Sequence, residues 1–232
     1  MHLKSLIPKF ENKRVRIVYD AAYPAISLLY GHILPYFSSK KLVYVVYSDS
    51  ICRRLREMYK SLHKERLPAS ELLEKSILIK VGQKECYPFK REKCMKSKNL
   101  FFIPENRVLE GNELIRNITE NITPDCIAVL AGFYLLPAIY GLAAIERLYH
   151  IFSEIPEETT LFSFYPKDFL DERLNKPLEK LFDVVVYVKK EDEFFYFGEE
   201  MYLIGIEQSI IKDIKPGYAR FKTGDDWTLF EV

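Results

Sequence analysis

Short apolar runs alternate along most of the chain with segments in which apolar residues recur at helical spacing. A parallel strand that is covered on both faces reads as such a continuous run, and a periodicity of three to four residues indicates a helix. We predict strands at 15–19, 42–47, 77–81, 100–103, 126–130, 159–164 and 184–188. We predict helices at 26–37, 51–62, 113–121 and 168–180, and one that follows the 126–130 strand to about residue 152.

The alternation of strand and helix predicts a mostly parallel sheet with helices on both faces. After residue 190 the strands are short and flank Gly198 and residues 224–226, which predicts antiparallel hairpins. No repeat or linker divides the chain. We therefore interpret residues 1–232 as one three-layer αβα domain, with a loop or insertion at 84–99 and a β-rich tail at 190–232.

Two local features refine the predicted helices. Pro24 lies near the start of the 26–37 helix, where its missing N–H does little harm, whereas Pro177 should break or restart the 168–180 helix. Ser50 or Asp49 can cap the 51–62 helix. Residues 126–145 lack any charge and approach the length of a membrane span, but Gly132, Pro137 and Gly141 favour a buried strand followed by an apolar helix.

The composition excludes few classes of function, but it bears on the partners and on the state of the cysteines. The net charge of +1 provides no global attraction to nucleic acid or to a membrane. Abundant Lys and Glu with only 4 Met and 4 Cys are typical of a thermophilic protein. The start of the sequence has no apolar core of signal-peptide length, so we expect a cytoplasmic protein with reduced thiols. Cys86 and Cys94 could still pair, because both lie in the polar loop at 84–99.

The order of elements resembles the RecA/KaiC branch of P-loop ATPases and, within it, a family of hyperthermophilic archaeal proteins with no assigned function. Residues 15–20 take the place of the strand that leads into the phosphate-binding loop. Residues 43–50, Val-Tyr-Val-Val-Tyr-Ser-Asp-Ser, take the place of the next strand, which in that branch supplies catalytic carboxylates. Residues 127–132 take the place of the Walker B strand. The resemblance covers nearly the whole chain by pattern and implies a RecA-like fold.

The chain departs from that resemblance where the phosphates would bind. A phosphate loop works because its glycines let backbone N–H groups converge on the phosphate, which a lysine neutralises. Here residues 20–27 read Asp-Ala-Ala-Tyr-Pro-Ala-Ile-Ser, so Asp20 and Ala25 replace the glycines and Ile26 replaces the lysine. Only Ser27 survives. Asp20 would also repel a phosphate by about 4 kcal/mol at about 4 Å and an effective dielectric of about 20.

The other catalytic positions point the same way. Of the paired carboxylates only Asp49 remains, and Ala131-Gly132 stands where a metal-linked Asp would follow the buried strand. We therefore expect no ATP hydrolysis, no catalytic residue, no metal and no cofactor, and a protein that acts through binding or assembly.

Polar residues nevertheless follow several predicted strands. Because parallel α/β sheets bind ligands beyond the carboxyl ends of their strands, these residues could form a remodelled pocket of a small-molecule sensor or enzyme. The alternative is that the aspartates are helix caps or turn residues. The candidate ligand-binding residues are Asp20, Tyr23, Ser27, Ser48, Asp49, Tyr165 and Lys167.

The loop at 84–98 offers a different hypothesis. It carries six basic and two acidic residues, a net of +4, with Tyr87 and Phe89 among them. Cations interleaved with aromatic side chains can hold single-stranded nucleic acid, so Lys90, Arg91 and Lys93 are candidate contacts for a nucleic-acid accessory role. The alternative is a solvated surface loop.

The helix after the 126–130 strand is apolar around most of its circumference, including Tyr134, Leu135, Leu136, Ile139, Tyr140 and Leu142. A sheet can cover only one side of such a helix. The uncovered side predicts a homo-oligomer or a protein partner.

Overall fold

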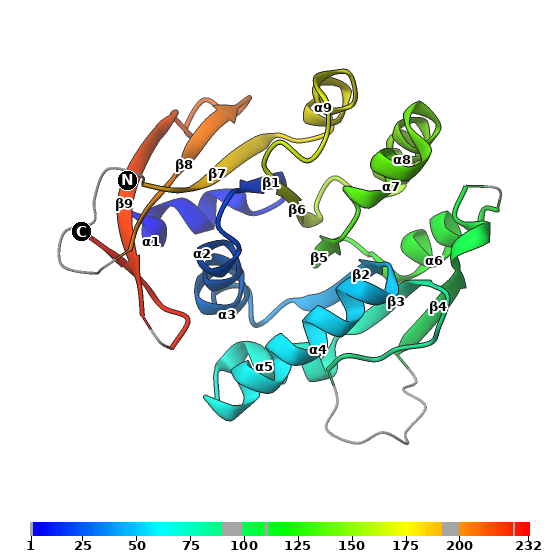
Figure 1. The fold of residues 1–232 in the computed structure, drawn as a ribbon, viewed down its shortest axis with the longest axis horizontal. Coiled ribbons are helices and arrows are strands. Elements are labelled where there is room, and N and C mark those ends of the chain that lie inside the picture. The colour runs from blue at the N-terminus through cyan, green and yellow to red at the C-terminus, as the bar shows by residue number, and fades with distance from the viewer. Residues whose placement is uncertain (1, 90–98, 110, 192–199, 225) are drawn as a thin grey trace.

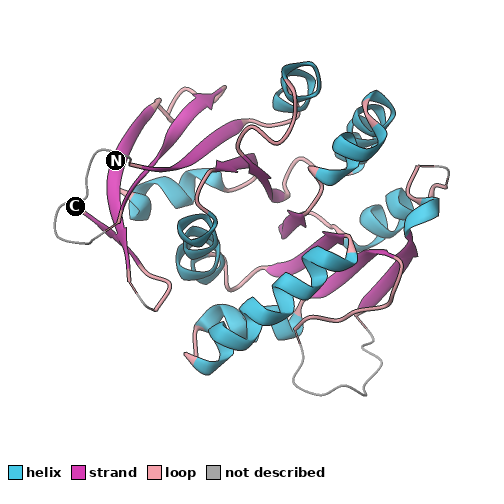
Figure 2. Cartoon of the chain, viewed as in Figure 1, coloured by secondary structure: helices cyan, strands magenta, loops and turns pink. Residues whose placement is uncertain are grey.

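The computed structural model describes residues 2–89, 99–109, 111–191, 200–224 and 226–232, drawn in Figure 1 and coloured by secondary structure in Figure 2. The strands are β1 (Arg14–Tyr19), β2 (Lys41–Tyr47), β3 (Ile77–Gly82), β4 (Leu100–Pro104), β5 (Cys126–Ala131), β6 (Thr160–Pro166), β7 (Val184–Lys190), β8 (Met201–Ser209), β9 (Gly217–Thr223) and β10 (Leu229–Glu231). The α-helices are α1 (Leu3–Leu6), α2 (Ala22–Ser27), α3 (Leu34–Tyr36), α4 (Asp49–Lys64), α5 (Pro68–Lys75), α6 (Glu113–Asn121), α7 (Leu135–Tyr140), α8 (Leu142–Glu154) and α9 (Glu172–Glu179).

These strands form one sheet in the order β10-β9-β8-β7-β1-β6-β5-β2-β3-β4. The run from β7 to β4 is parallel, and β8, β9 and β10 extend it as antiparallel strands. The predicted fold class is therefore confirmed, with a mostly parallel sheet and a C-terminal antiparallel tail. The chain passes from β1 to β2 across two intervening strands, β6 and β5, so the carboxyl ends of β1 and β2 are separated in the sheet.

Helices cover both faces of the sheet, as Figure 1 shows. One apolar core joins one face of the sheet to α1–α5, and the other joins the opposite face to α6–α9. Alternate residues of one strand therefore enter different cores: Val43 and Val45 of β2 pack on the α6–α9 side, and Tyr44 and Val46 pack on the α1–α5 side. Because both faces are covered, the strands need the continuous apolar runs seen in the sequence.

Several helix boundaries and caps differ from the predicted ones. The first long helix begins at Ala22 rather than Ile26, and a π-helical segment (Leu28–Ile33) joins α2 to α3. Ser48 caps α4, since its Oγ accepts a hydrogen bond from the Ile51 N–H at 3.3 Å. Pro177 does not break α9 but lies inside it, and the Tyr149 hydroxyl donates to the Pro177 carbonyl at 3.0 Å. The short helices α1 and α5 were not predicted.

The uncharged stretch at 126–145 forms the buried strand β5, the helix α7 and the beginning of α8. Gly141, at φ +61, separates the two helices. Among the described residues no helix has the length and apolar character that crossing a bilayer requires. The expected strand-plus-helix interpretation is therefore confirmed.

The expectation of reduced thiols is wrong for two cysteines, because Cys52 and Cys86 form a disulfide. Cys86 is therefore not paired with Cys94, which lies outside the described residues. The fold supplies the reason: the segment after β3 passes beside α4, so Cys52 and Cys86 approach to a Cα–Cα distance of 6.7 Å across 34 residues of sequence.

Candidate functional site

The candidate site is the edge of the sheet where the parallel strands end, and its first part is the junction between β1 and α2. Only Asp20 and Ala21 separate Tyr19, the last residue of β1, from Ala22, the first residue of α2. The segment aligned with the phosphate loop is thus mostly helix. The Asp20 carboxylate accepts a hydrogen bond from the Lys190 N–H at 2.8 Å, which ties the junction to β7. Ser27 is fully buried, and its Oγ has no hydrogen-bond partner.

The β9–β10 hairpin packs against α2 and the π-helical segment that follows it. Tyr23 donates a hydrogen bond to the Gly224 carbonyl at 2.9 Å, and its ring lies 4.9 Å from the Trp227 ring. The His32 Nε2 accepts a hydrogen bond from the Leu229 N–H at 3.0 Å. A side chain at Gly31 would collide with the Trp227 carbonyl. Tyr23 therefore belongs to an internal contact between the first helix and the C-terminal tail.

Asp49 follows β2 and pairs with a lysine that sequence reasoning missed. The Lys80 ammonium is fully buried and donates to the Asp49 carboxylate at 2.7 Å and to the Val81 carbonyl at 2.8 Å. Burial opposes ionisation of Asp49, but the hydrogen bond and charge of Lys80 outweigh it and lower the Asp49 pKa. Gly82 makes room for the pair, because a Cβ there would overlap both partners. Asp49 thus neutralises a cation of the protein itself.

Gly132, immediately after β5, stands where the resemblance would place a metal-linked carboxylate. Its φ is +81, and a Cβ at this position would lie 2.5 Å from the Tyr47 carbonyl oxygen. The close approach of β5 to the end of β2 therefore requires glycine here. No side chain of any kind fits at this position without moving β2.

The remaining predicted residues do not form one cluster. Tyr165 is buried on the α6–α9 face of the sheet, whereas the Lys167 side chain is 41% exposed and lies 3.9 Å from Asp168. Asp20 and Asp49 follow strands three places apart, which corresponds to roughly 14 Å. Their roles in ligand binding stay predictions, as do those of Lys90, Arg91 and Lys93, which lie outside the described residues.

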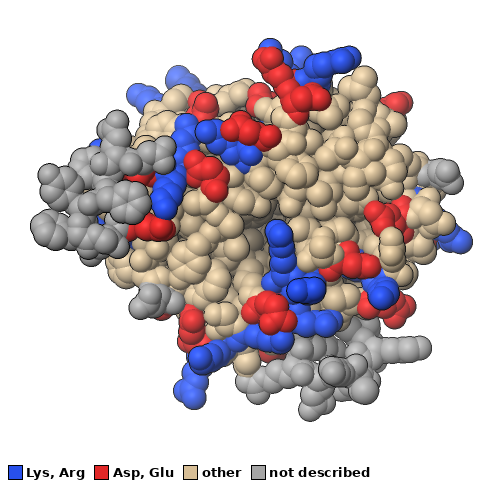
Figure 3. All heavy atoms as spheres, in the orientation of Figure 1, with Lys and Arg blue, Asp and Glu red and all other residues tan. Residues whose placement is uncertain are grey.

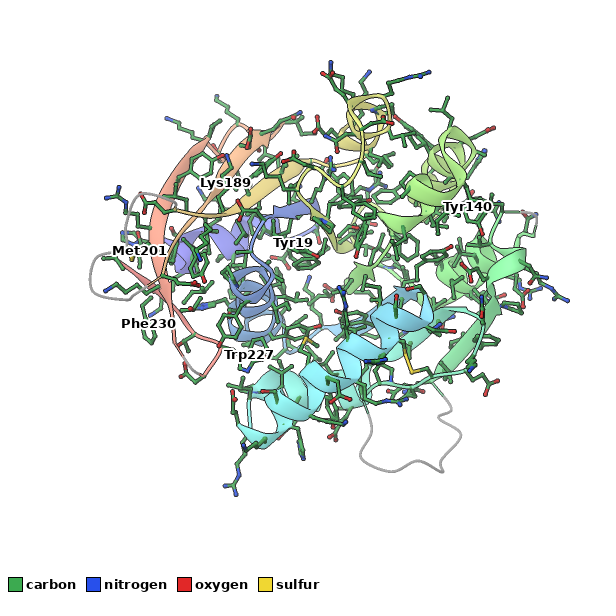
Figure 4. All side chains as sticks on the ribbon, viewed as in Figure 1. Tyr19, Tyr140, Lys189, Met201, Trp227 and Phe230 are labelled. Atoms are coloured by element: carbon green, nitrogen blue, oxygen red, sulfur yellow. A yellow bond between two sulfur atoms is a disulfide. The ribbon has the colours of Figure 1, made fainter. Side chains whose placement is uncertain are left out.

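Three other side chains near the strand ends lie close enough to interact electrostatically. Tyr19 ends β1, Tyr134 follows β5, and Arg54 lies on α4. Burial raises the pKa of Tyr19 to about 12, and the nearby Tyr134 adds to this effect. Burial also raises the pKa of Tyr134, and the charge of Arg54 opposes the rise in both tyrosines. Tyr19 lies near the centre of the view in Figure 4, and Figure 3 shows the same face hollowed near its centre beside a basic side chain. We call Tyr19, Tyr134 and Arg54 the strand-end crevice.

The strand order, the helices on both faces and the antiparallel tail define an α/β protein whose arrangement matches a RecA-like fold. Solved structures agree over nearly the whole chain. A protein designated PH0250 from Pyrococcus horikoshii OT3 matches at a TM-score of 0.63 and 16% identity, covering 94% of this chain and 97% of its own. The KaiC-like protein PH0186 from the same hyperthermophilic archaeon matches at 0.60 and 9% identity, covering 96% and 90%.

A third neighbour, the flagellar accessory protein FlaH from Methanocaldococcus jannaschii, matches at a TM-score of 0.59 and 10% identity, covering all of this chain and 96% of FlaH. No protein-family model and no curated protein sequence matches the chain. At these identities the likeness establishes the fold, and the resemblance to RecA/KaiC-like proteins of hyperthermophilic archaea is confirmed at that level.

Proposed function

We propose that this protein is a RecA/KaiC-like assembly or accessory protein that does not hydrolyse ATP. The observation that carries the proposal is the two-residue passage from β1 into α2. A phosphate-binding loop needs several consecutive N–H groups curved around an anion. Residues 22–27 instead form a helix. The FlaH neighbour, an accessory protein by name, is consistent with a role of this kind.

The surrounding groups support the same proposal. Asp20 would lie beside any phosphate bound at the start of α2, and Asp49, the one remaining carboxylate after β2, is engaged by Lys80. Gly132 has no space for a metal-binding side chain. Three positions that serve nucleotide chemistry in the resembled proteins are thus used here for packing or for internal charge balance.

The test is nucleotide binding and turnover on the purified protein. We expect no ATP hydrolysis above a buffer blank and no calorimetric signal with ATP and Mg²⁺. Hydrolysis that disappears in Asp49→Ala but persists in Asp168→Ala would overturn the proposal. Asp168 is a suitable control because its carboxylate is 86% exposed. Circular dichroism of both variants separates loss of activity from loss of fold.

A surface for assembly lies on α7 and the start of α8. Ile139 and Leu142 are 56% and 62% exposed, and they lie next to the exposed Ala138 and Ala143. We call these four residues the α7/α8 patch. Exposed apolar side chains that cluster in this way mark contact surfaces, and the patch supports a homo-oligomer as the assembled form.

The patch can be tested by charge insertion. Leu142→Glu should lower the mass measured by light scattering to that of a single chain, because a buried unpaired carboxylate is costly at an apolar contact. Ile210→Glu is the matched control, since Ile210 is 72% exposed on a different part of the surface. An unchanged mass in Leu142→Glu would exclude this surface as the contact.

The strand-end crevice supports a second function, the binding of a small anionic ligand by a sensor. Arg54 supplies a positive charge, and Tyr19 and Tyr134 supply rings and hydroxyls at the place where α/β sheets hold ligands. A thermal-shift screen of small anionic metabolites tests it. A stabilising compound should lose its effect in Arg54→Gln and keep it in Arg53→Gln, the exposed neighbour on the same helix. Equal responses in both variants would reject the crevice as the site.

A further inference from the structure

The α9 face of the sheet holds a buried arginine that the preceding sites do not use. Arg16 lies in the middle of β1, between Ser163 of β6 and Val185 of β7, and is only 3% exposed. Its guanidinium stacks over the Tyr165 ring with 4.4 Å between the cation and the ring centroid. Withdrawing such a charge from water costs several kcal/mol unless partners replace the water.

Those partners are incomplete. A guanidinium carries five N–H donors, but here Nη2 alone donates to a side chain, the Asn175 Oδ1 at 2.5 Å. The Nε and Nη1 atoms are buried without a hydrogen-bond partner. Glu179 approaches Nη1 at 3.5 Å, but the same carboxylate oxygen already accepts from the Asn175 amide at 2.8 Å. The charge is therefore paired at a distance while most of its donors lack an acceptor.

Arg16 borders a cavity of about 50 Å³. Its lining combines polar groups, Tyr187 of β7, Asn175 of α9 and the largely exposed carboxylate of Asp168, with the apolar side chains of Phe169 and Leu170 from the segment before α9. A single water needs about 10–15 Å³ of such volume, so the cavity admits a group of a few atoms and excludes a nucleotide. The lining is mostly polar, and the unsatisfied Arg16 donors call for an acceptor, while Phe169 and Leu170 supply a small apolar part against which a short carbon chain can lie.

We propose that this cavity is a binding site for a small monocarboxylate, with the carboxylate on the Arg16 guanidinium and the carbon end against Phe169 and Leu170. A carboxylate supplies acceptor oxygens of the kind that guanidinium groups bind most strongly. The cavity adjoins the strand-end crevice, since the Phe169 and Tyr134 ring centroids are 4.8 Å apart, but Tyr19, Tyr134 and Arg54 do not line it. It requires neither a nucleotide nor an oligomer.

Acetate is the probe, and acetamide is its neutral counterpart of the same size. The melting temperature of the wild-type protein should rise with acetate and saturate, relative to chloride at equal ionic strength, and should not respond to acetamide. Arg16→Met should abolish the acetate response. Arg14→Met is the matched control on the same strand, because Arg14 is already partnered by the Phe152 carbonyl at 2.8 Å. It should retain the full response.

A second measurement needs no variant and covers the case in which Arg16→Met does not fold. The Arg16 Nε–H resonance of the wild-type protein should shift progressively with acetate and remain fixed with acetamide. A crystal soaked in acetate should show a planar three-atom head beside Nε. An acetate response no larger than that of chloride, or one that Arg16→Met retains, would overturn the proposal, as would an Nε–H resonance that acetate does not move.

Discussion

At the strand-end edge the carboxylates have hydrogen-bond partners within the protein, whereas in the Arg16 cavity most guanidinium donors have none. At the strand ends, Asp20 and Asp49 accept hydrogen bonds from Lys190 and Lys80. In the cavity, a guanidinium that is 3% exposed keeps two nitrogens without a partner. The first region carries the positions that resemble catalytic motifs, and the second matches no motif.

The capacity to bind a ligand depends on which polar groups still lack a hydrogen-bond partner. A buried polar group that lacks a partner costs free energy that a ligand can recover, whereas a carboxylate already paired with a buried lysine must first lose that partner. Position in a motif is therefore a weaker guide to binding than the state of the hydrogen bonds. Four predictions test this comparison, beginning with the ion pair between Asp49 and Lys80.

The largest effect is expected from Asp49→Ala. Removing the carboxylate leaves the fully buried Lys80 without its counter-ion, and breaking a buried ion pair from one side costs about 3 kcal/mol in the free energy of unfolding. Lys80→Met should cost less, about 1 kcal/mol, because the Asp49 side chain is 37% exposed and water can solvate it. Urea denaturation of both variants measures the asymmetry. Equal losses would mean that Lys80 is not desolvated as described.

Gly132→Ala is expected to cost about 2 kcal/mol. The substitution adds the strain of a positive φ and a contact of 2.5 Å with the Tyr47 carbonyl. Gly141→Ala is the matched control, because Gly141 has a positive φ but nothing lies within 4 Å of an added Cβ. Its loss of stability therefore measures the backbone strain alone. If both variants lose the same stability, the approach of β5 to β2 is not what requires glycine at position 132.

Some elements of the fold could be predicted from the sequence, and others could not. The strands were predicted because two covered faces demand apolar runs, and the helix at 113–121 was predicted with the bounds that the structure has. The start of α2 was missed because Pro24 was placed near the start of a helix beginning at Ile26, whereas the helix begins at Ala22 and Pro24 is its third residue.

The two buried cations were missed for a different reason. Lys80 and Arg16 each interrupt an otherwise apolar strand, which is a visible signal that a partner or a ligand is needed. Their partners, Asp49 and Asn175, lie 31 and 159 residues away in sequence. Only the topology, which places α4 beside the end of β3 and α9 over β1, reveals that Lys80 is closely paired whereas Arg16 keeps two nitrogens without a hydrogen-bond partner.

Tyr23→Phe should lower the free energy of unfolding by about 1 kcal/mol, because it removes a hydrogen bond to the Gly224 carbonyl while preserving the ring contact with Trp227. Hydrogen exchange should rise in the β9–β10 hairpin more than in β1. Tyr36→Phe, at a 51% exposed position, is the control. Uniform exchange in both variants would show that Tyr23 does not hold the hairpin on α2.

The smallest effect is the pH dependence of Asp49→Asn, because the Asp49 carboxylate is more than a third exposed. Lys80 lowers the Asp49 pKa below its ordinary value of 3.8 despite the opposing effect of burial. A carboxyl whose pKa is lowered by folding adds stability that is present above its unfolded pKa and is lost as the pH falls through its folded pKa. The stability gap between wild type and Asp49→Asn should therefore be constant from pH 7 to pH 5, begin to narrow near the unfolded pKa, and close only when the pH lies below the lowered folded pKa. Urea denaturation from pH 7 to pH 3 measures the gap, and a gap at pH 3 as wide as that at pH 7 would assign the Asp49 contribution to its shape rather than to its charge.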